Sequence, residues 1–273
     1  MPDVVAAHID AATGLLEQRS ERIACAVATQ PSVNSLVIPE TDICRYHGAR
    51  EDTIFPLEYA FHLLGDVEDR TVIDLGCGDG VNTIILASMG ARVLSLDIAK
   101  DSLDLAAKRA AANKVDSRVT LLHADALDIP VEAGAVDAVL CTGLLHQVDP
   151  LKTARQIRRV LKPGGVAVFD EAVAGPMPFA AIKHFFPKPE GTDPVANNVP
   201  LNLRNVNSVC RAVGMPGRRR EFWLATRFIC RIGGRTFSSA AKAAQRLDAT
   251  VLQRFPFTRK IASPLVWEAR KES

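Results

Sequence analysis

The spacing of hydrophobic and polar positions changes along this chain of 273 residues. Between residues 71 and 169, short runs of Val, Ile and Leu alternate with stretches in which apolar residues recur every three or four positions. Near-continuous apolar runs are typical of strands that are buried on both faces, and the longer spacing is typical of helices. The middle of the chain therefore predicts an α/β fold with a doubly wound, mostly parallel sheet.

The limits of these elements follow from the same pattern. Strands are predicted at 71–75, 92–96, 118–122, 136–141 and 166–169, and helices at 81–89, 99–113 and 151–161. The sequence Lys162-Pro163-Gly164-Gly165 predicts a turn into the fifth strand, because Pro fixes φ and Gly accepts left-handed positions.

The flanking segments are less regular. Near-helical spacing predicts a helix or a helix pair over about 3–28 and a short helix at 56–64. The polar stretch 41–52 between them fits either a ligand lid or a surface turn with Tyr46 packed on the core. Six prolines and several Met and Phe residues between 176 and 200 predict either a lid or acceptor-pocket wall, or simple surface packing.

The C-terminal part is expected to complete the sheet. It predicts a helix at 201–213, strands at 218–225 and 263–269, and an amphipathic stretch at 238–255 between those strands. We therefore expect one structural domain with four parts. These are an N-terminal helical cap (1–66), a ligand-binding core (67–171), a Pro-rich insert (172–200) and a C-terminal completion with an inserted basic helix (201–273).

Charge is unevenly distributed although the whole chain carries only +2. From residue 201 onward there are 15 basic and 4 acidic residues, a net charge of +11 against −9 in the rest. A basic region of this kind fits an anionic partner such as a membrane surface, a phosphorylated substrate or nucleic acid, and it fits equally a solvated Arg-rich surface. We expect nucleic acid to be the least suitable of these partners.

Six cysteines are scattered without CxxC spacing, so neither a zinc site nor a disulfide framework is indicated, and no metal is expected. No apolar run reaches the ~18 residues that a membrane span requires, and the N-terminus lacks the pattern of a signal peptide. The expected location is the reducing cytoplasm.

Three glycines at alternate positions, Gly76, Gly78 and Gly80, stand between the first predicted strand and the following helix. Because glycine lacks Cβ, such a loop turns tightly and lets a ligand lie against its amides. The spacing differs from the G-x-G-x-x-G fingerprint of dinucleotide-binding proteins. Asp97 ends the second strand and Asp125 follows the third, where carboxylates can bind a ribose and an exocyclic amine.

From about Val72 to Glu171 the chain resembles the class I S-adenosylmethionine-dependent methyltransferases. The resemblance depends on the Asp-Leu-Gly-Cys-Gly-Asp-Gly loop, on Asp97, on Asp125, and on Val136-Asp137-Ala138-Val139-Leu140 followed by Lys162-Pro163-Gly164-Gly165. It implies a Rossmann-like, seven-stranded sheet that is mostly parallel with an antiparallel last strand. It also implies S-adenosyl-L-methionine as the cofactor.

The resemblance also implies roles for single residues. Gly76 and Gly78 would meet the methionine part of the cofactor, and Asp74 would hold the loop and the amino group. Asp97 would bind the ribose and Asp125 the adenine amine, although either Asp alone fits a turn or a helix cap. The full set of implied cofactor residues is Tyr46, Asp74, Gly76, Cys77, Gly78, Asp97, Ile98, Asp125, Ala126 and Thr142.

Three residues are candidates for catalysis. His146 is the first candidate for a general base, because a Leu-His pair bears the base at the same place in the similar plant-type O-methyltransferases; a structural or substrate-contact role is the alternative. Glu171 would orient that His or touch the acceptor, or cap a helix. His47, beside Tyr46, would close over the cofactor.

Two other histidines have weaker claims. His184 would reach the acceptor pocket from the insert, and His123 is expected to be a satisfied core residue.

The function predicted from these features is methyl transfer by in-line displacement to a small apolar or aromatic acceptor, most simply at oxygen. The chain has no Asn-Pro-Pro-Tyr or Asp-Pro-Pro-Tyr motif after the fourth strand, which argues against adenine or glutamine N-methylation. Two alternatives stay open. One is an anionic, membrane-associated or nucleic-acid acceptor, and the other is a non-catalytic S-adenosylmethionine-binding protein.

Overall fold

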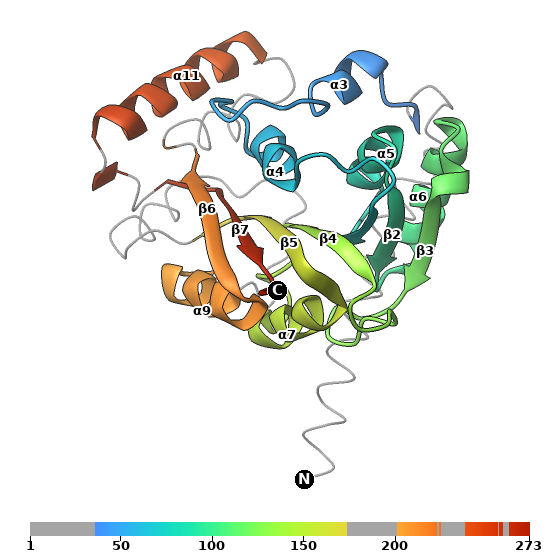
Figure 1. Cartoon of the computed structure of the whole chain (residues 1–273). Helices are drawn as coiled ribbons and strands as arrows, with labels where there is room; N and C mark the ends of the chain where they lie inside the picture. The colour runs from blue at the N-terminus through green and yellow to red at the C-terminus, as the bar shows by residue number, and fades with distance from the viewer. Residues whose placement is uncertain (1–35, 174–200, 223, 225–237, 256, 259–261) are drawn as a thin grey trace, which may run out of the picture.

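The structure, a computed structural model, describes residues 36–173, 201–222, 224, 238–255, 257–258 and 262–273 (Figure 1). The helix or helix pair expected at 3–28 and the Pro-rich insert at 176–200, with His184, lie outside the described residues.

The described strands form one seven-stranded sheet in the order β3-β2-β1-β4-β5-β7-β6. Strands β1 to β5 are mutually parallel, and β7 runs antiparallel to both of its neighbours. This confirms the mostly parallel, doubly wound sheet expected from the sequence. The strands are β1 (Thr71–Leu75), β2 (Arg92–Asp97), β3 (Val119–His123), β4 (Val136–Thr142), β5 (Leu161–Glu171), β6 (Met215–Glu221) and β7 (Leu265–Arg270).

Helices cover both faces of the sheet, with α4 and α5 on one face and α7 and α9 on the other (Figure 1). Both layers bury the apolar residues of the central strands, which explains why those strands read as continuous Val, Ile and Leu. The described helices are α3 (Glu40–Cys44), α4 (Pro56–Leu64), α5 (Val81–Ser88), α6 (Lys100–Ala112), the short 3-10 turn η1 (Asp116–Arg118), α7 (Pro150–Val160), α9 (Leu203–Val213) and α11 (Ser238–Arg254).

Two strands, β5 and β6, differ by three residues or more from their predicted limits. Strand β6 begins at Met215 rather than at 218, because Gly214 closes α9 with a bond to the Cys210 carbonyl and the chain pairs at once with β7. Strand β5 begins at Leu161 and includes the predicted turn as an irregularity between two pairs with β4. Gly164 has the expected positive φ, +76°.

The carboxyl ends of parallel strands meet at one edge of a sheet, which is where open α/β sheets bind their ligands. The ends of β1, β2, β3, β4 and β5 carry most of the residues singled out in the sequence. Strand β6 runs parallel to β5 across β7, so its end, at Glu221, reaches the same edge. This edge therefore holds the candidate site.

Candidate active site

The glycine loop is held tightly between two strands. The amides of Gly76 and Cys77 both donate to the Leu96 carbonyl, at 2.8 and 3.0 Å. A Cβ added at Gly80 would lie 2.7 Å from the Cβ of Ala106, whereas one added at Gly78 would meet nothing within 4 Å. Gly80 is thus required by packing against α6, and Gly78 faces open space in which a ligand can lie.

Asp97 closes the loop at the end of β2. One oxygen of its buried carboxylate accepts the Gly78 amide and the other accepts the Ala99 amide, each at 2.9 Å. These bonds make Asp97 a turn residue, as one reading of the sequence had it. They also fix the carboxylate beside the loop, and each carboxylate oxygen can accept more than one hydrogen bond.

Asp74 is the most unusual polar group of the site. It is 1% exposed, and its Oδ2 accepts the hydroxyl of Thr83 at 2.7 Å, while its Oδ1 has no hydrogen-bond partner among the described residues. Burial raises the pKa of Asp74 to about 7, although the bond from Thr83 opposes the rise. A buried acceptor without a partner is costly, so this oxygen suits a donor supplied by a ligand or a water.

The segment after β3 combines a turn with an open surface. Asp125 Oδ1 accepts the Leu127 amide at 2.9 Å, Ala126 is buried, and Ile98 is 36% exposed. His123 bonds the Ile98 carbonyl through Nε2 at 2.9 Å but is exposed, so its expected place in the core is wrong. The reason is position, because β3 is the edge strand of the sheet.

Thr142 ends β4 beside the glycine loop. Its hydroxyl accepts a hydrogen bond from Asn82 Nδ2 at 3.0 Å, which joins α5 to the end of β4. Sequence reasoning missed Asn82 and Thr83. The signal was their place in the first turn of the helix that follows the glycine loop.

His146 and Glu171 come together as one of the sequence readings expected. Glu171 Oε1 accepts the amides of Leu144 and Leu145, both at 2.7 Å, and its Oε2 lies 3.1 Å from His146 Nδ1. The Glu171 side chain is fully buried, and that of His146 is 24% exposed. Since the carboxylate accepts, Nδ1 carries the proton, and Nε2 keeps a lone pair for a substrate proton.

Tyr46 and His47 follow α3. The ring of Tyr46 packs on Phe61 with 4.9 Å between centroids, which is the packing alternative considered from the sequence. Tyr46 also lines a cavity near the end of β5. His47 is exposed, and within the described part of the chain no hydrogen bond or ion pair joins it to His146 or Glu171.

Asp170, directly before Glu171, was missed. It lines the same cavity as Tyr46, and burial together with the nearby Glu171 raises its pKa to about 7. Successive residues of a strand point to opposite faces, so a second carboxylate at this strand end was a signal for a second polar position.

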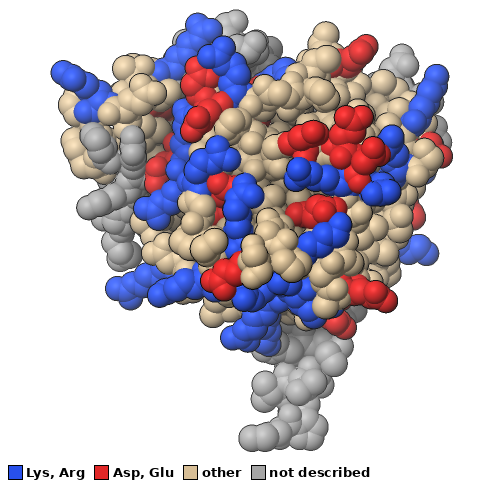
Figure 2. Space-filling view, viewed as in Figure 1, with Lys and Arg blue, Asp and Glu red and all other residues tan. Residues whose placement is uncertain are grey.

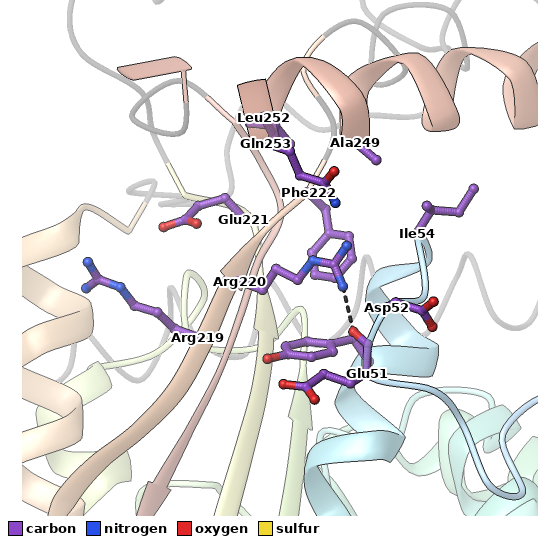
Figure 3. A pocket seen from close by; sticks show the side chains of 11 residues that line it. Glu51, Asp52, Ile54, Arg219, Arg220, Glu221, Phe222, Ala249, Leu252 and Gln253 are labelled. Carbon is purple, nitrogen blue, oxygen red and sulfur yellow. Dashed lines mark hydrogen bonds between the residues drawn. The ribbon is translucent and has the colours of Figure 1, made fainter. Parts of the chain in front are cut away.

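Two of the three arginines of β6, Arg218 and Arg220, are engaged within the protein. Arg218 Nε bonds Glu268 at 2.9 Å. The Arg220 guanidinium donates to the Glu51 carbonyl at 2.7 Å and lies 5.5 and 5.0 Å from the ring centroids of Tyr59 and Phe222. Arg220, Glu51, Tyr59 and Phe222 border a cavity of about 320 Å³ under α11 (Figure 3).

Lys and Arg side chains are interspersed with Asp and Glu over the face shown in Figure 2. The internal bonds of Arg218 and Arg220 engage two basic residues of the C-terminal part, and the choice between an anionic partner and a solvated surface for this part stays a prediction.

Residues 73–169 match the family model described as "Methyltransferase domain". A demethylmenaquinone methyltransferase of Clavibacter sepedonicus is 37% identical over 113 residues, 41% of this chain and 45% of that protein. A ubiquinone biosynthesis O-methyltransferase of Bordetella avium is 32% identical over 126 residues, 45% of this chain and 51% of that protein. The chain thus spans about half the length of these curated relatives.

Among solved structures, geranyl diphosphate C-methyltransferase from Streptomyces coelicolor A3(2) has a TM-score of 0.59 at 18% identity, covering 78% of this chain and 77% of that one. At this identity the likeness concerns the fold. The sheet order, the glycine loop with its buried carboxylates and the matches over residues 73–169 agree with one another. Over residues 73–169 the chain is therefore a methyltransferase domain similar to those of S-adenosylmethionine-dependent methyltransferases.

Proposed function

We propose that this protein transfers the methyl group of S-adenosylmethionine to an oxygen atom of a small apolar or aromatic acceptor. The observation that carries the proposal is the buried Glu171 holding His146 at the ligand-binding edge, with Nε2 of the imidazole left to accept a proton. The name of the Bordetella avium relative, an O-methyltransferase of ubiquinone biosynthesis, supports oxygen as the methylated atom. The cytoplasmic location expected from the sequence stays a prediction.

The residues at the glycine loop fit the cofactor. Asp97 is fixed where it can accept the ribose hydroxyls, and the unpartnered Oδ1 of Asp74 suits the amino group, directly or through water. Gly78 leaves room for the methionine part, and Asp125 with Ala126 would hold the adenine. When bound, the cofactor supplies a methyl carbon that is already activated by the positive charge on sulfur.

The contribution of the protein to the chemistry is alignment and proton transfer. His146 Nε2 takes the proton of the acceptor hydroxyl while the oxygen attacks in line, and Glu171 stabilises the imidazolium that forms. The two amides that donate to Glu171 hold its carboxylate in place. Positioning alone can lower the barrier of such a reaction by roughly 7–11 kcal/mol in favourable cases.

The test uses the full chain, S-adenosylmethionine radiolabelled in its methyl group, and para-butylphenol, para-butylaniline and para-butylbenzoate as acceptors. The expected result is label in the methyl ether of the phenol, identified by mass spectrometry. Label in a ring-methylated or N-methylated product would overturn oxygen as the acceptor atom. Binding of S-adenosylhomocysteine by calorimetry without turnover of any acceptor would favour the non-catalytic alternative.

A further inference from the structure

A cavity of about 450 Å³ lies beside the end of β5, between the segment that links α3 to α4 and the residue before β7. Most of its walls are apolar, with the rings of Tyr46 and Phe55 and the side chains of Leu57 and Pro264 among them. Asp170 is the polar group that β5 contributes to it.

The register of the sheet places this cavity next to the glycine-loop site. Thr142 of β4 pairs with Asp170 of β5, so the two side chains project from the same face, the face covered by α4 and α5. Neighbouring strands lie about 4.8 Å apart. The Glu171 side chain leaves β5 on the opposite face and reaches the segment before α7.

Asp170 has no ion-pair partner among the described residues around the cavity. Glu58 forms an ion pair with Arg45 at 2.6 Å, so the two charges neutralise each other. Glu58 also accepts a hydrogen bond from the hydroxyl of Thr53. Among the described residues, no hydrogen bond to the carboxylate of Asp170 is found, whereas Glu171 next to it adds negative charge. Because Arg45 is already paired with Glu58, an anion entering this apolar cavity would meet the carboxylates of Asp170 and Glu171 without a further cation among the described residues that line it.

We propose that this cavity binds an uncharged, apolar molecule through a hydroxyl group that hydrogen-bonds to Asp170, and that it rejects anions of the same shape. Identifying that molecule with the methyl acceptor rests on the proposed function, but its binding does not.

The test compares para-butylphenol with para-butylbenzoate, which match in shape and differ in charge near neutral pH. Binding of each to the full chain saturated with S-adenosylhomocysteine is measured by calorimetry. We expect the phenol to bind at least about tenfold more tightly than the benzoate, which corresponds to about 1.4 kcal/mol. Absence of phenol binding, or equal binding of the two compounds, would overturn the proposal.

Asp170→Asn removes the charge and keeps the shape. It is expected to strengthen benzoate binding and so reduce the ratio. Asp137→Asn is the matched control, because Asp137 lies near the start of β4, bonded to Lys162 and the Thr71 amide, and its variant should leave the ratio unchanged. A ratio that Asp170→Asn does not alter would contradict the role of Asp170.

A second measurement does not depend on the folding of Asp170→Asn. Lowering the pH through about 7 neutralises Asp170 and should strengthen benzoate binding while phenol binding stays constant. Benzoate affinity that is flat across this range would count against the proposal. Failure of methyl transfer with the phenol preference intact would overturn the proposed function alone.

Discussion

The glycine-loop half of the ligand-binding edge and the Asp170 half are built in opposite ways. In the first half, backbone amides and buried carboxylates in and beside the glycine loop bond one another, as Asp97 does with Gly78 and Ala99. The second half contains the cavity beside Asp170 and the cavity under α11. Side chains from separate segments line each of them, as Tyr46 and Pro264 do in the first and Arg220 and Tyr59 do in the second. The first arrangement suits one fixed ligand. If the methyl acceptor binds in the second half, as proposed, its binding site can vary without altering the glycine loop.

The largest effect is expected on the rate of methyl transfer, which requires the cofactor and the acceptor to be bound together. His146→Gln removes the proton acceptor and should lower kcat by roughly 100- to 10,000-fold, the usual contribution of a positioned acid or base. The affinity for S-adenosylhomocysteine should stay unchanged, because His146 contacts Glu171 rather than the glycine loop. Parallel losses of rate and of cofactor affinity would show that the halves are not separable.

A pair of glycine variants separates packing from ligand access within the first half. Gly80→Ala forces a positive φ and a 2.7 Å contact with Ala106, so the free energy of unfolding should fall by about 2–3 kcal/mol in urea denaturation. Gly78→Ala meets no neighbour and should cost only about 1 kcal/mol of stability. Its main effect should be weaker S-adenosylhomocysteine binding, and the reverse ranking in stability would contradict this division.

The pH dependence of stability tests the unpartnered oxygen of Asp74. Its pKa of about 7 in the folded protein lies above the ordinary 3.8, so the folded state keeps a proton that the unfolded state releases. Stability should therefore fall as the pH rises from about 4 to about 7, with Asp74 contributing at most about 1.4 kcal/mol per pH unit and Asp170, whose pKa is also raised to about 7, adding to the slope. The slope should be smaller in Asp74→Asn. An unchanged slope in urea denaturation would remove Asp74 as its source.

The smallest effect is expected in the second half. Arg220→Ala removes a bond to the Glu51 carbonyl and the contacts with the rings of Tyr59 and Phe222, and should lower the free energy of unfolding by about 1–2 kcal/mol. Arg219→Ala, at an exposed neighbour on the same strand, is the control and should change little. Equal losses in both variants would mean that β6 tolerates no truncation, whatever the contacts of Arg220.

The same contrast explains what could be predicted from the sequence. The glycine loop, Asp97 and the order of strands were predictable, because periodicity and strand-end position are local properties. The bond between His146 and Glu171 joins neighbouring strand ends and was anticipated as one of several readings.

The Asp170 cavity was not predicted. Its walls come from Tyr46, Phe55 and Pro264, which are far apart in the sequence, and no local sequence pattern predicts that they line one cavity. The packing of Arg220 was not predicted either. The run of three arginines predicts an exposed charged surface, and only the contacts of Arg220 with Tyr59, Phe222 and Glu51 show that this side chain is packed. The four-part division of the chain and the roles of the single cofactor residues stay predictions.

The central claim is that the carboxylate at the end of β2 recognises the cofactor. Calorimetric titration of the full chain with S-adenosylhomocysteine tests it directly, with Asp97→Ala compared against Asp104→Ala, an exposed carboxylate on α6. Two charge-assisted hydrogen bonds to the ribose predict a loss of about 3 kcal/mol, or roughly 100-fold in Kd, in Asp97→Ala and none in Asp104→Ala. Wild-type protein that binds no S-adenosylhomocysteine, or Asp97→Ala that binds it as tightly as the wild type, would contradict the account.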